Sequence, residues 1–279
     1  MLYGNIFTLL KNSDKLADTP FKGSIGTPFI ELQSVDSTNN YALTQVHAGL
    51  APHGAAFFAH EQSAGKGQRG RIWKSEKDSS ILTSIVFDPR PLSLSNQFPL
   101  NACIALSACQ FLEKHAGDDT KIKWPNDLYW QDRKAGGILI ENIIGGITAK
   151  GKPRNGWQWS IAGIGININQ GKFPEGLSNP ISLKQITGKE FDPVSLAKEL
   201  YDQIEKNWEI LLKEGFENIH ASYLDRLYKK DRSVKFKKGS RVFEATIKKV
   251  STEGFLVVQH AVEEEFRTGE VEWLLFNQV

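Results

Sequence analysis

The sequence predicts an α+β protein: a mixed, largely antiparallel sheet with helices packed on one side, followed by a small β-barrel. Three features of the chain indicate this architecture. Segments with strand character alternate with segments of helical character in the first part of the chain. Two long segments repeat apolar residues at helical spacing. From about residue 232 the pattern changes to short strands separated by glycine-containing turns, so we expect one domain over residues 1–231 and a second over 232–279.

The larger domain is expected to begin with a strand, a helix and a second strand. Residues 28–35 and 55–59 have strand character, and residues 36–50 open with capping residues and close at a glycine. Further strands are predicted at residues 79–87, 121–124, 127–130, 137–141 and 159–167. Helices are predicted at residues 100–116 and 216–227, and where apolar residues recur every three or four positions, at Leu196, Leu200, Ile204, Trp208 and Leu211. Residues 145–156 are typical of an exposed hairpin loop.

The C-terminal part of the chain is predicted to be a small barrel of five strands. The strands are expected at residues 233–236, 241–247, 254–259, 264–268 and 272–276. A unit this short has a marginal core of its own, so we expect it to dock on the larger domain.

The composition limits the function classes. The 279 residues are 40% hydrophobic, enough for a sizeable core, and 34 basic against 32 acidic side chains leave a net charge of +2, which excludes a chain-wide field for nucleic acid. Cys103 and Cys109 lie six positions apart in one predicted helix and suggest neither a disulfide framework nor a metal site. The N-terminal residues lack the features of a signal peptide, and no run approaches eighteen apolar residues. These features predict a cytoplasmic protein that does not enter a membrane.

A glycine-rich segment at residues 61–73 predicts an anion site. Three glycines alternate with three cations, and glycines let backbone N–H groups turn toward an anion that the cations neutralise. The residues are Gly65, Gly67 and Gly70, with Lys66, Arg69 and Arg71. The segment lacks the spacing of a Walker loop. A solvated basic turn is the alternative interpretation.

A second segment, residues 121–141, places a Pro-Asn-Asp turn, a basic pair and two glycines between apolar stretches. Gly136 and Gly137 would permit a ligand to approach Lys134 closely, which favours a functional lysine over a surface hairpin lysine. Asn126 and Asp127 follow a proline, and by themselves they are typical of a turn.

Four motifs, in order and at comparable spacing, resemble those of the biotin protein ligases. They are DSTN at 36–39, EQSAGKGQRGRIW at 61–73, KWPNDLYWQDRKAGGILIE at 123–141 and GIGININ at 163–169, and the resemblance covers roughly residues 30–279. It implies a catalytic domain of the biotin/lipoate ligase fold, which is similar to class II aminoacyl-tRNA synthetases, over residues 1–231, and an SH3-like barrel over 232–279. It also implies an ATP-dependent ligase that converts biotin to biotinyl-5′-AMP and transfers it to a lysine of a biotin carboxyl carrier domain.

The resemblance assigns roles to individual residues. It places biotin against Ser37, Thr38, Asn39, Gln62, Gly65, Lys66, Gly67, Gln68, Trp73, Lys134, Gly136 and Gly137. It places ATP against Lys66, Arg69, Arg71, Lys123, Asn126, Lys134 and Asn167. The expected catalytic residues are Lys134, Lys66, Arg71 and Asp127. Plainer structural roles stay open for some of them: a helix cap for Ser37 and Thr38, a core position for Trp73 and a strand-end turn for Asn167.

The implied chemistry suits these residue types. The biotin carboxylate and the α-phosphate are both anions, and a fixed ammonium such as Lys134 lowers their repulsion in a site drier than bulk water. Magnesium is expected on the triphosphate, and no residue is assigned as a metal ligand. Closure of the 65–71 loop would keep water from the mixed anhydride. Asp127 is a candidate to position the acceptor amine or to accept its proton.

The chain departs from the family pattern at two places. Gln68 stands where many members have arginine, which removes one charged contact to the phosphate or to Asp127. Only some 27 residues precede the first predicted strand, too few for the winged helix-turn-helix of the repressor members, so we expect no operator DNA binding.

Other interpretations stay open. Within the same fold, the chain could be a lipoate ligase or a related acyl transferase. Residues 226–249 carry ten basic side chains against Asp231 and Glu244. This segment is typical of a solvated face, but it also permits a nucleic-acid module or a surface that steers an acidic carrier domain. The oligomeric state is not determined by the sequence, and a homodimer is one alternative.

Overall fold

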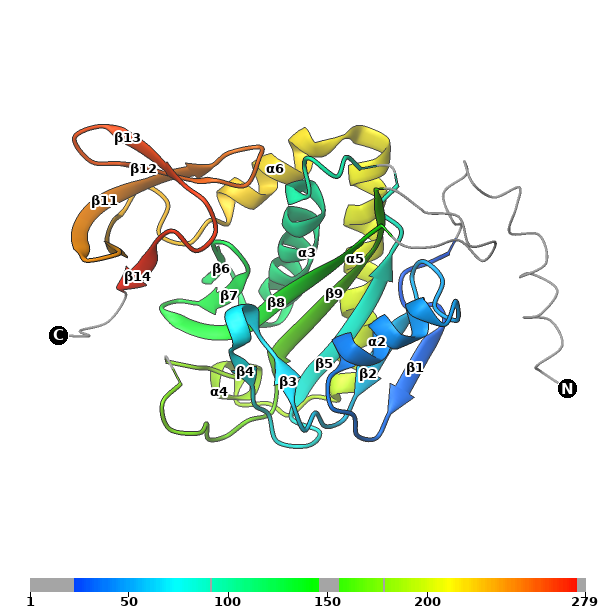
Figure 1. Ribbon diagram of the computed structural model, residues 1–279. Coiled ribbons are helices and arrows are strands. Elements are labelled where there is room, and N and C mark those ends of the chain that lie inside the picture. The colour runs from blue at the N-terminus through cyan, green and yellow to red at the C-terminus, as the bar shows by residue number, and fades with distance from the viewer. Residues whose placement is uncertain (1–22, 91, 146–155, 178, 275–279) are drawn as a thin grey trace, which may run out of the picture.

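A computed structural model describes residues 23–90, 92–145, 156–177 and 179–274 (Figure 1). Its main feature is a seven-stranded sheet in which only the first pair of strands, β1 and β2, is parallel among the described residues. The strand order is β1 (Phe29–Leu32), β2 (Ala56–Ala59), β5 (Ser80–Phe87), β9 (Trp157–Asn167), β8 (Arg133–Ile144), β7 (Asp127–Trp130) and β6 (Thr120–Lys123). The predicted mixed, largely antiparallel sheet is confirmed.

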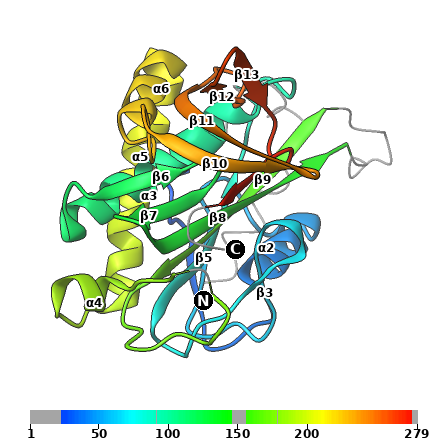
Figure 2. The same cartoon turned by 90° about the vertical axis from the view of Figure 1, so that its left-hand side faces the viewer.

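Helices cover both faces of this sheet (Figure 2). α3 (Phe98–Ala116) and α5 (Pro193–Glu214) cover one face, and α6 (Phe216–Asp225) packs against both helices. α2 (Thr38–His47) lies on the opposite face, because Phe57 points to it while Phe58 points to the larger cluster around α3 and α5. The sequence predicted helices on one side of the sheet, and α2 is the exception. Apolar side chains alternate along β2 and face both sides of the sheet, so α2 covers the second face.

The predicted helices are present with shifted ends. The apolar residues of α5 recur every three or four positions and are buried, and Asp192 caps the helix by accepting hydrogen bonds from the N–H groups of Val194 and Ser195. α3 begins at Phe98, two residues before the predicted start, and Pro99 occupies its first turn, where a proline is well tolerated. A short helix, α4 (Leu183–Thr187), was not predicted.

Strand β8 is longer than the strand predicted at residues 137–141. It starts at Arg133, so Lys134 lies within the strand and not in a hairpin turn. β8 and β9 pair antiparallel, and the Gly145 N–H donates to the Gly156 oxygen at 2.8 Å. Most of the loop predicted between them, residues 145–156, lies outside the described residues. Residues 1–22 and residues 275 and 276 also lie outside the described residues. The expected lack of an operator-binding domain concerns residues 1–22, so it stays a prediction.

The C-terminal part forms a five-stranded antiparallel sheet, consistent with the predicted SH3-like unit. Its strand order is β13 (Glu263–Phe266), β12 (Leu256–Gln259), β11 (Arg241–Val250), β10 (Ser233–Lys238) and β14 (Glu272–Leu274). Buried residues alternate with exposed ones along β10, where Val234 and Phe236 point inward.

This unit docks on the larger domain, as expected from its small size, and lies beside β6 and β7 (Figures 1 and 2). Trp124 donates its indole N–H to the Gly254 oxygen at 2.9 Å, and Gly254 packs so closely on the Phe98 ring that a Cβ would lie 2.6 Å from it. One buried apolar cluster runs through both parts. The division of the chain into two domains at residues 231 and 232 therefore stays a prediction. No helix of the described residues combines the length and the apolar character needed to cross a bilayer.

Candidate active site

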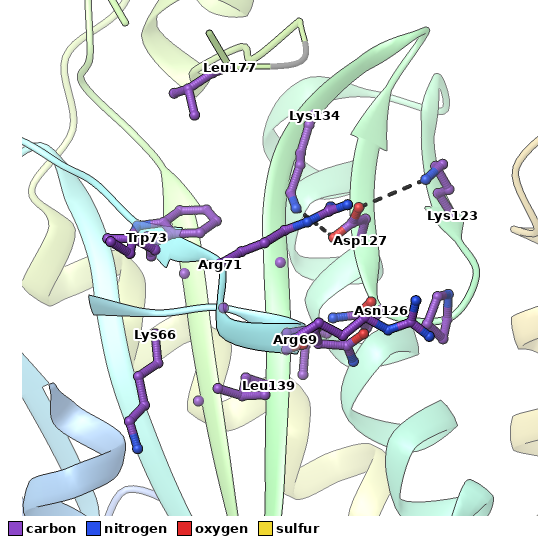
Figure 3. A pocket seen from close by; sticks show the side chains of 18 of the residues that line it. Lys66, Arg69, Arg71, Trp73, Lys123, Asn126, Asp127, Lys134, Leu139 and Leu177 are labelled. Carbon is purple, nitrogen blue, oxygen red and sulfur yellow. Dashed lines mark hydrogen bonds and ion pairs between the residues drawn. The ribbon is translucent and has the colours of Figure 1, made fainter. Parts of the chain in front are cut away.

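A cavity of about 1420 Å³ opens between the glycine-rich segment, strands β7 to β9, the start of α2 and the C-terminal sheet (Figure 3). Drug-sized ligands typically occupy pockets of about 300–1,000 Å³, so this cavity has room for two small molecules side by side. All the residues predicted to bind biotin or ATP or to act in catalysis line it except Gly65 and Gly136, and Gly70 of the predicted anion site does not line it either. Folding therefore brings together segments that lie far apart in the chain.

The glycine-rich segment is a β-hairpin, which we call the flap (residues 65–73). It consists of β3 (Gly65–Lys66), β4 (Ile72–Trp73) and a turn with positive φ at Arg69 (57°) and Gly70 (73°). The Gly67 N–H donates to the Arg71 oxygen at 2.7 Å and closes the hairpin. The sequence predicted a glycine-rich cationic flap here, and in the structure β3 and β4 pair antiparallel across it.

The cations of the flap point in different directions. Arg71 extends over the cavity toward Asp127, whereas Lys66 points the opposite way, and its Nζ lies 3.6 Å from Glu141 Oε1 (Figure 3). In this structure Lys66 is thus at the far end of the cavity from Lys134. Its predicted contact with both biotin and phosphate stays a prediction, and reaching the phosphate requires the side chain to leave Glu141.

One end of the cavity is a network of short polar side chains. Gln62 Oε1 accepts hydrogen bonds from the Thr38 N–H at 2.7 Å and from the Thr38 hydroxyl at 3.1 Å. Gln62 thus caps α2, while the Ser37 side chain makes no capping hydrogen bond although it stands at the N-cap position. The helix-cap interpretation of Ser37 is therefore wrong for its side chain, and the hydroxyl is not committed to the helix.

The Asn39 side chain lies at this polar end, where hydrogen bonds fix both atoms of its amide. Its Nδ2 donates to Glu141 Oε2 at 2.7 Å, and its Oδ1 accepts from the Ser84 hydroxyl at 2.5 Å. Gly163 makes room for the amide, because a Cβ there would lie 2.2 Å from Asn39 Oδ1. Ser84 and Glu141 were missed in the sequence, although a carboxylate inside the apolar run of β8 was a signal that could have identified Glu141.

Trp73 forms an apolar wall in the middle of the cavity. Its indole lies against Gly165, where a Cβ would be 2.7 Å from the ring atom Cε2. The Trp73 Nε1 is buried and has no hydrogen-bond partner. The indole lines the cavity, so a position wholly within the core is excluded, while its contact with biotin stays a prediction.

The other end of the cavity is cationic and is organised around one carboxylate. Asp127 Oδ1 lies 2.6 Å from Lys134 Nζ, and its Oδ2 lies 4.0 Å from Lys123 Nζ (Figure 3). A Cβ at Gly137 would lie 3.4 Å from both Lys134 Nζ and Asp127 Oδ1, so the glycine leaves space for this pair. Burial lowers the pKa of Lys123, the charge of Asp127 opposes that effect, and the charges of Lys134 and Arg71 add to it.

A strand irregularity puts Lys134 on the same face as Asp127. In the β7–β8 ladder Asp127 pairs with Gly137, but Tyr129 pairs with Lys134, so one extra residue is inserted in β8. Side chains alternate along a strand, and the extra residue turns Lys134 to the face that Asp127 and Tyr129 share. Without this bulge, Lys134 would point away from the cavity.

The side chains of two residues predicted to contact ATP, Asn126 and Asn167, form hydrogen bonds with backbone oxygens. The Asn126 side-chain amide donates to the Ile138 oxygen, and Asn167 Nδ2 donates to the Ile181 oxygen at 3.1 Å and to the Lys134 oxygen at 3.4 Å. These amides hold the backbone around Lys134. The expected hydrogen bonding of the Asn167 amide to adenine stays a prediction. It requires Asn167 Nδ2 to give up its hydrogen bonds to the backbone oxygens.

The C-terminal sheet closes one side of the cavity, which the sequence did not predict. The ring centroid of Trp273 lies 5.1 Å from Lys123 Nζ. Arg69 reaches the loop before β14, where a Cβ at Gly269 would lie 1.2 Å from Arg69 Nη2. No local signal in the sequence connects positions separated by 150 to 200 residues, so only the folded chain reveals these contacts.

Ion pairs neutralise much of the basic segment 226–249. The pairs are Arg226–Glu113, Lys229–Asp132, Lys230–Asp225, Lys235–Glu244, Lys238–Glu264 and Lys248–Asp231. This pairing favours the solvated-face interpretation over a nucleic-acid module. Steering of an acidic carrier domain by the remaining cations stays a prediction.

In the part of the chain that the structure describes, no group of three or more His, Cys, Asp or Glu side chains is arranged to hold a metal ion. Magnesium bound to a nucleotide usually takes only one or two carboxylates from the protein, with phosphate oxygens and water as its other ligands. Asp127 is a carboxylate of this kind in the cavity wall.

The sequence matches a known protein family and several curated proteins. Residues 31–152 match the model of the Biotin/lipoate A/B protein ligase family. The chain is 31% identical to the bifunctional ligase/repressor BirA of Escherichia coli K12 over 236 residues, which are 82% of this chain and 68% of that protein. It is 30% identical to BirA of Bacillus spizizenii, over 76% of this chain and 65% of that protein. The chain therefore spans about two thirds of the length of these curated relatives.

A solved structure is similar over almost the whole fold. The biotin protein ligase from Aquifex aeolicus in complex with biotin and ATP superposes with a TM-score of 0.72 at 25% identity, covering 91% of this chain and 99% of that one. The match thus extends through both sheets and is not limited to the sequence motifs.

Proposed function

Because the chain belongs to the biotin protein ligase family, we propose that it activates biotin with ATP to form biotinyl-5′-AMP and transfers the biotin to a lysine of a biotin carboxyl carrier domain. The proposal rests on the order in which polar, apolar and cationic side chains line the cavity from one end to the other. Short polar groups at Thr38 and Asn39 form one end, the Trp73 indole forms the wall, and Lys134 and Arg71 converge on Asp127 at the other end.

Biotin has the same order of groups. Its ureido ring needs donors and acceptors, which the hydroxyl and amide groups at the α2 end supply. Its thiophane ring and valeryl chain are apolar and match the Trp73 indole. Its carboxylate then lies at the cationic end, near Lys134. In this orientation biotin would lie against residues that are expected to bind it, and the fold would not have to change.

The first half-reaction needs positioning and charge neutralisation. The carboxylate is already ionised at neutral pH. One of its oxygens attacks the α-phosphorus of ATP, the bond from that phosphorus to the bridging oxygen breaks, and pyrophosphate leaves with the electron pair. Lys134 and Arg71 reduce the repulsion between the two anions. Magnesium would supply further neutralisation of the triphosphate.

The second half-reaction delivers the acyl group to an amine. The acceptor lysine amine attacks the carbonyl carbon of the anhydride, and AMP leaves. Lysine amines are mostly protonated at neutral pH, so a carboxylate that holds the amine and accepts its proton assists the attack. The position of Asp127 in the wall between Lys123 and Lys134 supports this role. The flap would shield the anhydride from water.

Biotin-dependent exchange of labelled pyrophosphate into ATP tests the first half-reaction. Lipoate is the control, since the matching family model covers both ligand classes. The expected result is exchange with biotin and none with lipoate, followed by a mass increase of a carrier domain on one lysine. Exchange that depends on lipoate and not on biotin would establish the alternative, a lipoate ligase. Exchange with neither acid would refute the proposal.

A further inference from the structure

We propose that Trp273, in the C-terminal sheet, is a positioning residue for the cationic end of the cavity and that it acts through Lys123. The inference rests on the proposed function for its kinetic test. It assigns a specific task to a side chain that none of the four sequence motifs contains.

The surroundings of Lys123 are unusual for a lysine. Its side chain is only 14% exposed, and its ammonium lies 5.1 Å from the ring centroid of Trp273 and 5.4 Å from that of Tyr129. Both distances fall within the range in which a cation is attracted to an aromatic ring. The carboxylate of Asp127 is 4.0 Å away, beyond hydrogen-bonding distance. Two aromatic rings therefore stabilise this ammonium in addition to the charge of Asp127.

Packing, and not a hydrogen bond, sets the position of Trp273. The ring contacts Phe236 edge-on at a centroid distance of 5.2 Å and Tyr228 at 6.1 Å. Its Nε1 is buried and has no hydrogen-bond partner. Strand β14 pairs with β10, so the ring is fixed to the C-terminal sheet while its other neighbour is the Lys123 ammonium of β6. The contact thus joins the two parts of the chain at the cavity wall.

The contact between Trp273 and Lys123 determines how the neighbouring cations are arranged around Asp127. Lys134, Lys123 and Arg71 all surround the one carboxylate, and Lys134 holds it at 2.6 Å. Without the Trp273 ring, the ammonium of Lys123 loses one of its two aromatic partners. It would then either turn to solvent, which removes a cation from the cavity wall, or move onto Asp127 and compete with Lys134. Either outcome disturbs the phosphate side of the cavity more than the biotin side.

A graded aromatic series tests the role of the ring. Trp273→Leu should raise KM for ATP in the pyrophosphate exchange assay by about five- to thirtyfold, the range for losing a cation–π contact at a desolvated site, with little change in KM for biotin. Trp273→Phe keeps an aromatic face and should recover most of the loss. Phe243→Leu is the matched control, because Phe243 also packs on Phe236 but is not one of the two rings, Tyr129 and Trp273, that lie over the Lys123 ammonium. Equal defects in the Phe and Leu variants, or a similar defect in the control, would overturn the proposal.

A double-mutant cycle tests the path through Lys123. In a Lys123→Met background, Trp273→Leu should have almost no further effect on KM for ATP, because the cation that it positions is gone. A further loss as large as in the wild type would show that Trp273 acts only on the fold.

Amine labelling of Lys123, read by mass spectrometry on the folded protein, needs no activity and keeps the two proposals separate. The Trp273→Leu variant should change the labelling rate of Lys123 several-fold relative to Lys121 on the same strand, with a faster rate if the ammonium turns to solvent and a slower rate if it pairs with Asp127. An unchanged rate would refute the inference even if the ligase activity is established. Conversely, an inactive wild type with the expected labelling change would refute the proposed function alone.

Discussion

Lys134→Ala should separate catalysis from folding at this site. The Lys134 and Asp127 side chains are 29% and 17% exposed, so their ion pair is only partly shielded from water. Asp127 also keeps Lys123 at 4.0 Å, so the substitution does not leave a bare buried carboxylate. Ion pairs near the surface contribute about 0.2–1 kcal/mol, and a loss of that size lowers Tm of a chain this long by no more than about 4 °C.

The loss in adenylation should be much larger. Two unit charges 4 Å apart interact by about 4 kcal/mol at an effective dielectric constant of 20, and each 1.4 kcal/mol is a factor of ten. Removing one preorganised charge stabiliser accordingly costs about two to three orders of magnitude in rate. Lys134 is the ammonium nearest to Asp127, so its removal should affect the step in which the two anions meet.

The assay is biotin-dependent pyrophosphate exchange, measured together with thermal unfolding. Lys121→Ala is the matched control, because Lys121 lies on β6 in the same sheet, separated from β8 by β7, and does not line the cavity. The control should keep near wild-type exchange. Adenylation within about threefold of wild type in Lys134→Ala would refute the assigned role, since the expected effect is at least about a hundredfold.

Two further predictions concern the flap and the sheet edge. Gly165→Ala places a Cβ 2.7 Å from the Trp73 ring, so the indole must move, and KM for biotin should rise about tenfold to a hundredfold; an unchanged KM would exclude Trp73 from the biotin wall. His60 affects stability: burial alone would lower its pKa, but hydrogen bonds to Glu31 and Asp78 outweigh burial and raise the pKa above 6.5. The stability that it adds over His60→Gln is full below about pH 6.5 and is lost as pH rises through the folded pKa, which urea unfolding at several pH values measures. A difference that grows with pH would contradict this.

The sequence by itself determined most of the secondary structure and the pieces of the site. The helical periodicity of α5 and the strand character of β5 are local properties, because they depend on residues a few positions apart. The same holds for the flap glycines, which leave room for tight turns, and for the Pro-Asn-Asp turn before β7. The motifs that contain Lys134, Asp127 and Trp73 were therefore found without any knowledge of the fold, and these residues do line one cavity.

Only the tertiary structure decided which way these side chains point and what surrounds them. The bulge in β8 turns Lys134 toward Asp127, and a shift of one residue along a strand would turn it away, so composition and spacing could not determine its direction. Lys66 pairs with Glu141, and Trp273 contacts Lys123, across separations of 75 and 150 residues. Such contacts depend on how whole sheets pack, because their energy comes from burial and charge in the folded chain and not from local backbone preference.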